Sequence, residues 1–182
     1  KYKIQEAGDG EQGLTTALES VPDLIISDLM MPKMDGMQLC EKLKTDERTS
    51  HIPIILLTAK ADIETKLDGL HRGADDYMAK PFDGRELEAR IYNLIENRRK
   101  LQDKFSQKFN LSATEIKVES LEDRFLKKVK GAIETRMDDH TLGVESLAEE
   151  VAMSTIQLYR KLKAITGQTP NELIRNIRLD RA

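Results

Sequence analysis

Four residues have types and spacing that would let them act together in one site: Asp28, Thr58, Tyr77 and Lys80. Asp28 ends the apolar run Asp-Leu-Ile-Ile-Ser-Asp. A carboxylate in that position can accept a phosphoryl group, bind a metal ion or cap the loop that follows. The joint spacing of the four residues is more specific than any one of them, while the three uses of Asp28 stay open at this point.

The segments around these residues alternate between strand-like and helix-like patterns. We expect strands at residues 2–6, 23–28, 52–58 and 76–79, and helices at 11–20, 37–44 and 63–72. This alternation predicts an α/β fold with a parallel sheet covered by helices on both faces. Functional residues gather beyond the carboxyl ends of such strands, so Asp28, Thr58 and Lys80 are expected to meet.

From Gly84 onward the pattern becomes helical. Leu87, Leu94 and Leu101 recur every seventh residue, which predicts one helix running into a connector. The repeat fits either the face of a last helix packed on its own sheet or the seam of a dimer. Residues 110–120 lose the periodicity and are predicted to be a linker.

Residues 121–182 are predicted to be all helical. Apolar residues recur every fourth position over 121–137, which indicates an amphipathic helix. Ser154 is a good N-cap for a helix with Leu158 and Leu162 on its inner face, and Gly167 ends that helix. The short helix before it is separated by Ala152-Met153-Ser154 only, which matches helix-turn-helix spacing.

The composition narrows the class of protein. The chain has 182 residues and a net charge of −3, with 12 Lys+Arg against 19 Asp+Glu in residues 1–97 and 17 against 13 in residues 98–182. An acidic half joined to a basic half suggests two modules, the basic one a candidate for nucleic acid. The single cysteine, Cys40, excludes an intrachain disulfide framework and is expected to be a buried apolar residue in a cytoplasmic protein.

Residues 1–97 resemble the receiver domain of a two-component response regulator, a flavodoxin-like fold. Ser-Asp28-Leu-Met-Met-Pro matches the family's phosphoacceptor and Leu-Thr58-Ala-Lys its phosphate-binding hydroxyl. Tyr77 matches the aromatic switch, and Lys80-Pro-Phe matches the lysine that pairs with phosphate, followed by a cis peptide bond. A phosphorylated carboxylate needs such an ammonium and hydroxyl because it gains charge and acceptor oxygens.

The same resemblance implies a Mg²⁺ site formed by Asp28, the backbone carbonyl of Met30 and an acidic pair that ends the family's first strand. No such pair occurs in the chain, whose residues 2–6 match the family's second strand. We therefore expect an incomplete receiver, with the first strand and acidic pair preceding Lys1. A small phosphodonor with Mg²⁺ should leave Asp28 of this chain unmodified and label a chain extended upstream.

Residues 121–182 resemble the first helix-turn-helix unit of AraC-type DNA-binding domains. The resemblance rests on residues 154–163, Gly167, Pro170 and the segment Ile177-Arg-Leu-Asp-Arg-Ala182. It places base contacts on Ile156, Tyr159 and Arg160, with Thr155 and Lys163 more suited to phosphate. The family's second helix-turn-helix unit is not in the chain.

Together these features predict a phosphorylation-controlled transcription regulator, with a receiver at 1–97, a connector at 98–120 and a DNA-binding unit at 121–182. The fusion resembles the C-terminal part of Bacteroidetes hybrid sensor kinases. The expected partners are a histidine kinase domain, double-stranded DNA and a second copy of the chain, with a membrane only through an upstream sensor. A stand-alone response regulator or a phosphorylation-independent scaffold is the alternative. A catalytic role is not expected, because an aspartate-nucleophile phosphatase would want a second Asp where Met30 stands.

Overall fold

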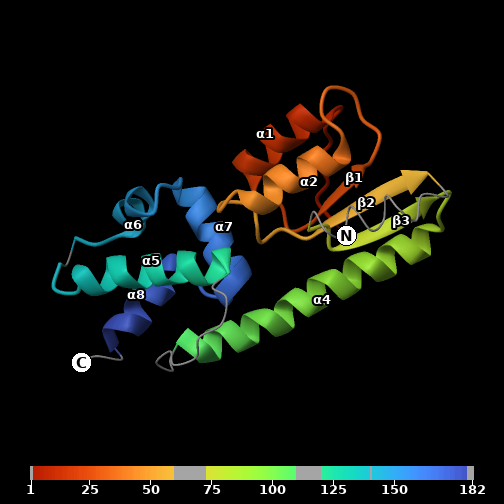
Figure 1. Ribbon diagram of the computed structural model, residues 1–182. Coiled ribbons are helices and arrows are strands. Elements are labelled where there is room, and N and C mark those ends of the chain that lie inside the picture. The colour runs from red at the N-terminus through yellow and green to blue at the C-terminus, as the bar shows by residue number, and fades with distance from the viewer. Residues whose placement is uncertain (1, 60–72, 110–119, 140, 180–182) are drawn as a thin grey trace. The chain divides into compact units, whose positions relative to one another are not determined.

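The computed structural model describes residues 2–59, 73–109, 120–139 and 141–179. The chain forms two compact units, Lys1–Asn97 and Arg98–Ala182. Figure 1 shows their elements in chain order. The predicted helix at 63–72 and most of the predicted linker lie outside the described residues.

Unit 1 contains a parallel sheet, as predicted, with three strands among the described residues. The strands are β1 (Ile25–Asp28), β2 (Ile54–Ala59) and β3 (Asp76–Lys80), in the order β1-β2-β3. Asp28 pairs with Leu57 and Thr58 pairs with Ala79, so all three strands end at one edge of the sheet. This register is what places the predicted site residues close to one another.

Two short helices cover one face of the sheet. Helix α1 (Gly10–Ser20) and helix α2 (Gly36–Thr45) begin at the capping carboxylates of Asp9 and Asp35, which accept from Gln12 and Gln38 backbone N–H groups. The core beneath them joins α1 and α2 to β2, and its buried members include Ala17, Leu39, Cys40, Leu43, Ile54 and Leu56. Cys40 is fully buried, as predicted, and burial raises the pKa of its thiol to about 11.

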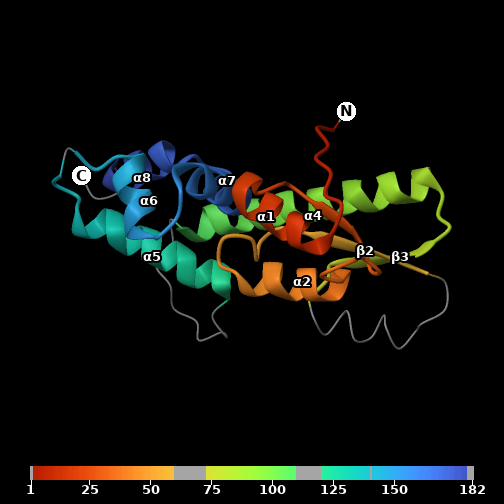
Figure 2. The same ribbon diagram turned by 90° about the horizontal axis from the view of Figure 1, so that it is seen from above.

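Helix α4 (Gly84–Phe109) follows β3, and its first half covers the opposite face of the sheet. Arg90 of α4 donates from Nη1 to both carboxylate oxygens of Asp76, each at 2.7 Å. The predicted continuous helix is confirmed over these residues. Figure 2, seen from above, also shows the sheet between α2 and the first half of α4. The cis peptide bond expected between Lys80 and Pro81 is present.

The strand predictions are wrong in part, and β1 begins at Ile25 rather than at Asp23. Residues 2–6 form no strand, and Tyr2 and Ile4 are 59 % and 77 % exposed. A strand exists only where a neighbour supplies hydrogen bonds, and β1 is paired with β2 alone among the described residues. The second strand starts at Ile54 rather than Ile52, because Ile52 N–H bonds to Thr49 O in a turn and Pro53 has no N–H to give.

In the part of unit 2 that the structure describes, four helices beyond α4 share one core. They are α5 (Leu121–Thr135), α6 (Val144–Glu150), α7 (Thr155–Thr166) and α8 (Pro170–Leu179). Ser120 and Ser154 form capping boxes with Asp123 and Gln157, and Gly167 ends α7 in the left-handed conformation, φ 73°. Helix α5 ends two residues before the predicted Met137. Its side chains share a core with α6, α7 and α8 through Phe125, Ile133, Leu147, Leu158, Leu162 and Leu173.

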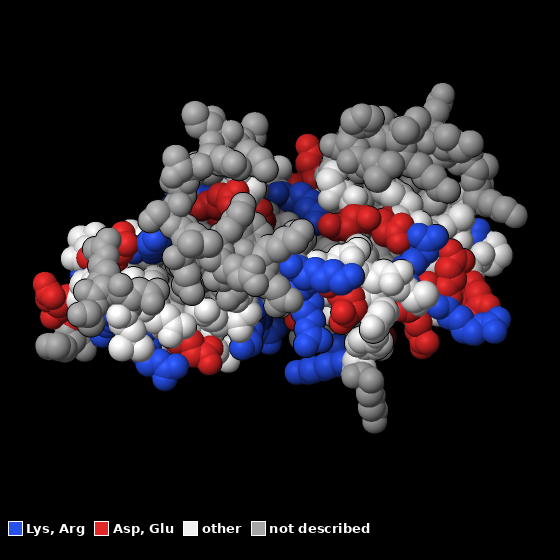
Figure 3. Space-filling view, turned by 90° about the horizontal axis from the view of Figure 1, so that it is seen from below, with Lys and Arg blue, Asp and Glu red and all other residues white. Residues whose placement is uncertain are grey.

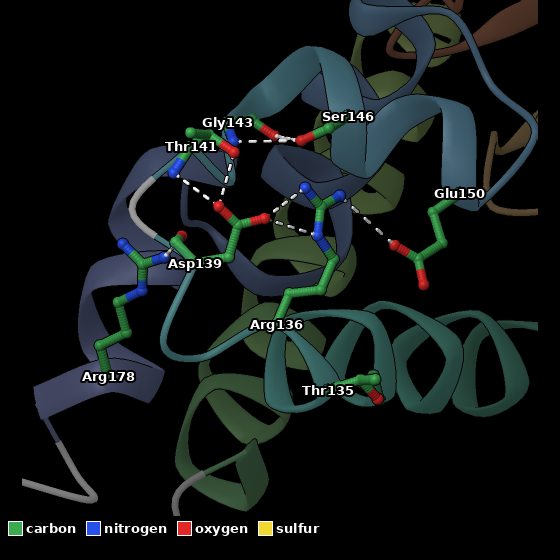
Figure 4. A network of polar contacts seen from close by, with 9 residues as sticks. Thr135, Arg136, Asp139, Thr141, Gly143, Ser146, Glu150 and Arg178 are labelled. Carbon is green, nitrogen blue, oxygen red and sulfur yellow. Dashed lines mark hydrogen bonds and ion pairs between the residues drawn. The ribbon is translucent and has the colours of Figure 1, made fainter.

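A polar network stabilises the loop between α5 and α6 (Figure 4). The Asp139 carboxylate accepts from Arg136 Nη2 at 2.6 Å and from the Thr141 hydroxyl and N–H at 2.5 and 2.8 Å. These contacts hold the pKa of Asp139 well below its usual range, chiefly through the Thr141 hydroxyl and Arg136. Arg178 of α8 donates to Asp139 O at 2.7 Å, so the network joins three parts of unit 2.

Among the described helices none is long and apolar enough to cross a membrane.

Candidate functional site

Asp28 and Lys80 meet at the carboxyl edge of the sheet. Asp28 ends β1 and Lys80 ends β3, two strands separated by β2, and Lys80 Nζ donates to Asp28 Oδ2. Their side chains are 38 % and 41 % exposed, so both groups are reachable from solvent. The hydrogen bond from Lys80 is the main reason that the pKa of Asp28 lies below its usual value. The carboxylate is therefore held in its anionic form beside a cation.

The loop after Asp28 is shaped by backbone contacts. Leu29 N–H donates to Leu57 O at 2.8 Å, and Met30 N–H lies 3.3 Å from Asp28 Oδ1. Gly36, the first residue of α2, packs so closely that a Cβ there would lie 2.2 Å from Asp28 O. Only glycine fits that position, a requirement that the sequence pattern did not reveal.

Thr58 lies at the same edge of the sheet but on the other face from Asp28. Its side chain is 5 % exposed, and its hydroxyl donates to Ala59 O at 3.1 Å. The register places Thr58 beside Ala79, one residue before Lys80. The structure thus gathers Asp28, Thr58 and Lys80 at one edge of the sheet, and Asp28 and Lys80 are in direct side-chain contact there.

Tyr77 lies on the same face of the sheet as Thr58, because the residue it pairs with comes two positions before Thr58 in β2. It pairs with Leu56, and its hydroxyl lies 3.7 Å from Met37 Sδ in α2. Its ring packs against the core under α2, and burial raises the pKa of its phenol to about 12. The Tyr77 ring is thus partly buried against α2 in this structure.

The described residues offer a small set of oxygen ligands for a cation at this edge. They are the half-buried Asp28 carboxylate and the backbone carbonyl of Met30, a residue that is 80 % exposed. In the described part of the chain no three His, Cys, Asp or Glu residues cluster as a metal site. Mg²⁺ commonly uses one or two carboxylates and completes its octahedron with water and phosphate oxygens, so this donor set fits one side of such an ion.

A second candidate surface lies on α7. Thr155, Ile156, Tyr159, Arg160 and Lys163 are all exposed, with Ile156 at 57 % and Tyr159 at 47 %. Leu158 and Leu162 on the opposite side are fully buried. The helix therefore presents the predicted DNA-contacting residues together on one solvent-facing surface.

Lys161 was not singled out by the sequence pattern. Its side chain is fully buried, with Nζ 4.5 Å from the centroid of the Phe125 ring. A buried ammonium over an aromatic face is held by cation–π attraction. Since lysine is usually exposed, only the packing of α7 on α5 reveals that Lys161 belongs to the core.

Charge is distributed differently in the two halves of the chain, but neither half is uniform. Figure 3 shows acidic and basic side chains interspersed on the face that it draws. The excess of basic residues in residues 98–182 is a sum over that half of the chain.

Unit 1 matches a known family and a solved structure. The family described as response regulator receiver domain matches residues 1–92. A putative response regulator from Chloroflexus aurantiacus, solved by crystallography, is 38 % identical, with a TM-score of 0.51 over 52 % of this chain and 78 % of that one. The matched region contains the flavodoxin-like parallel sheet and the site at its edge.

Two curated relatives differ in how much of the chain they match. "Histidine kinase P4" from Formosa agariphila is 42 % identical over 181 residues, which is all of this chain and 13 % of that protein. "DNA-binding dual master transcriptional regulator RpaA" from Synechocystis is 48 % identical over 94 residues, 52 % of this chain and 39 % of that protein. The chain thus spans a minor part of either relative.

Proposed function

The chain belongs to the response regulator receiver family through residues 1–92, and on that premise we propose that it is a phosphorylation-controlled, DNA-binding regulator of a two-component system. The observation that carries the first half of this proposal is the contact between Lys80 and Asp28 at the carboxyl edge of the sheet. It pairs an anionic nucleophile with the ammonium that its phosphorylated form requires.

In the proposed reaction Asp28 accepts phosphate from a phosphohistidine of a kinase domain. A carboxylate oxygen attacks phosphorus, the O–P bond forms as the P–N bond breaks, and the electron pair returns to the imidazole nitrogen. Lys80 stays beside Asp28 and offsets the added charge, as a charge-assisted hydrogen bond does. Thr58 turns its hydroxyl from Ala59 O to the phosphoryl group, which leaves space that Tyr77 can fill.

Receiver domains bind Mg²⁺ in their active site. In this chain Asp28 and the carbonyl of Met30 would hold the ion, which supplies charge neutralisation for phosphoryl oxygens when bound. Lys80 and Thr58 act on the phosphoryl group from the protein side.

The phosphoacceptor role is tested by intact-mass measurement of a chain extended upstream with an acidic pair, incubated with acetyl phosphate and Mg²⁺. We expect one added phosphoryl group, and none in the Asp28→Asn variant. An equal mass gain in Asp28→Asn would refute the assignment. Asp35→Asn, which changes the N-cap of α2 instead, is the matched control and should be labelled like the parent.

We also propose that unit 2 is an AraC-type helix-turn-helix unit that binds double-stranded DNA through α7. The support is the exposed set Ile156, Tyr159 and Arg160 on a helix whose other side is fully buried. A helix with this arrangement fits the major groove, where Arg160 can read a guanine edge in bidentate fashion. The paired acidic and basic halves of the chain then correspond to phosphate acceptance and DNA binding.

The proposed setting is a hybrid sensor kinase, in which kinase and receiver share one polypeptide. Its support is the relative named a histidine kinase, which matches this chain over its whole length and is much longer. A stand-alone response regulator is the second candidate, supported by the similarity of residues in unit 1 to RpaA. Sequencing the reading frame upstream separates the two, because only the hybrid encodes a kinase core there.

A further inference from the structure

The C-terminal end of α7 is held by a side chain from α4. Gln102, in the part of α4 that belongs to unit 2, places Nε2 3.0 Å from Lys163 O and 2.5 Å from Ala164 O. These two carbonyls lie in the last turn of α7, which ends at Thr166. The two hydrogens of one amide nitrogen match the two acceptors, so the group that faces them must be the amide nitrogen.

The last turn of α7 needs such a donor. Helix ends leave their final carbonyls without partners from the same helix. The Gln168 N–H, which would continue the helix to Ala164 O, donates instead to Thr166 Oγ1 at 3.2 Å. Gly167 N–H bonds to Lys163 O at 3.0 Å as the chain turns away in the left-handed conformation. Gln102 therefore supplies a donor at Ala164 O where the backbone does not.

We propose that Gln102 is a positioning residue for DNA binding, which clamps the C-terminal end of α7 and makes the connector helix part of the DNA-reading unit. This inference rests on the proposed function of α7. The backbone carbonyl of Lys163 is one of the two clamped groups, and its side chain is a proposed phosphate contact. Clamping that turn fixes the angle at which Ile156, Tyr159 and Arg160 are presented.

Two substitutions test the clamp in different ways. Gln102→Ala removes the donor without changing the charge. Gln102→Glu replaces it with a carboxylate, which faces two carbonyl oxygens at the negative end of the helix dipole and repels them. Asn97→Asp is the matched control, because it makes the same amide-to-carboxylate change at an exposed position of α4.

The experiment measures two properties of the full 182-residue chain. Hydrogen exchange reports the amides of Ile165, Thr166 and Gly167, which we expect to exchange about three- to tenfold faster in both Gln102 variants. Binding to a random-sequence DNA duplex, measured across a salt series, should weaken about threefold or more while the melting temperature of unit 2 stays unchanged. Asn97→Asp should change exchange at neither Thr166 nor Gly167.

The outcomes separate the inference from the function beneath it. Unchanged exchange in both Gln102 variants overturns the clamp. Faster exchange with unchanged DNA affinity overturns the positioning role and leaves Gln102 as a cap alone. If the unaltered chain binds no DNA at low salt, the proposed function of unit 2 fails and the positioning role fails with it, while the exchange result still decides whether the clamp exists.

Discussion

Lys80 Nζ bonds directly to Asp28 Oδ2, although the two residues come from strands that are not neighbours in the sheet. Both residues end their strands, and the parallel register brings those ends to one edge. A lysine one residue earlier on β3 would point to the other face of the sheet. The contact thus depends on strand length, strand register and the alternation of side chains together.

Replacing Lys80 should raise the pKa of Asp28. The hydrogen bond from Lys80 is the main cause that lowers this pKa, so Lys80→Ala should move it up toward the usual value for aspartate. A pH titration of the Asp28 carboxyl carbon by NMR measures the shift. Lys33→Ala is the control. Lys33 pairs with Asp9 at 2.6 Å, so this substitution should raise the pKa of Asp9 and leave that of Asp28 unchanged. An unaltered Asp28 titration in Lys80→Ala would contradict the assignment.

Gly36→Ala should destabilise unit 1. The added methyl group would lie 2.2 Å from Asp28 O, so α2 or the loop after β1 must move, at a cost of about 1–3 kcal/mol in the free energy of unfolding. Urea unfolding followed by circular dichroism measures the loss. Gly84→Ala adds the same methyl group where nothing lies within 4 Å, and it should not destabilise the protein. Equal free energies of unfolding for the two variants would show that the loop after β1 moves at no cost.

Tyr77 should ionise late in an alkaline titration. Burial raises the pKa of its phenol to about 12, above the ordinary value of 10.0. Because the folded-state pKa is the higher one, the stabilisation is complete below pH 10 and is lost as the pH rises toward 12. Absorbance at the phenolate band should show a late step that Tyr77→Phe removes. Between pH 10 and pH 12 the Tyr77→Phe variant should lose less stability than the parent. A late absorbance step that persists in Tyr77→Phe would show that another tyrosine produces it.

Arg160 and Leu162 lie two positions apart on α7, and substitutions at them should affect different properties. Leu162→Ala should lower stability, whereas Arg160→Ala should change base preference. Leu162 is fully buried, so Leu162→Ala should lower the free energy of unfolding by about 2–5 kcal/mol. Arg160 is exposed, so Arg160→Ala should change the free energy of unfolding by roughly 0.5 kcal/mol or less. In a chain carrying two helix-turn-helix units, the same substitution should relax the preference for one base by about 1–3 kcal/mol. Thermal or urea unfolding and binding to a panel of DNA sites measure the two effects. Unchanged base preference in Arg160→Ala would remove this residue from the interface.

Asp139 should make the stability of unit 2 depend on acidity. Its folded-state pKa is lowered, so its contribution is present above the unfolded value near 3.8 and is lost as the pH falls below it. Asp139→Asn should melt at a lower temperature than the parent at neutral pH, and the difference should shrink in acid. Asp138→Asn, at the exposed neighbouring position, should melt like the parent at both pH values. A constant difference between Asp139→Asn and the parent would show that charge is not the cause.

The sequence by itself determined the local features of this protein. Helix starts are readable because a cap such as Ser154 acts within a few residues, and Gly167 marks the end of α7 for the same reason. Alternating strands and helices were enough to predict a parallel sheet and the meeting of Asp28 with Lys80. These predictions depend on short-range physics and on one rule of sheet geometry.

Only the tertiary structure decided the features that need a distant partner. Residues 2–6 carry a strand-like pattern yet form no strand, because the hydrogen bonds of a strand come from its neighbour. Lys161 is buried because Phe125 of another helix lies over it, and Gln102 meets α7 across a long stretch of sequence. No local pattern contains these contacts, since each is fixed by how helices pack and by which polar groups that packing leaves to be satisfied.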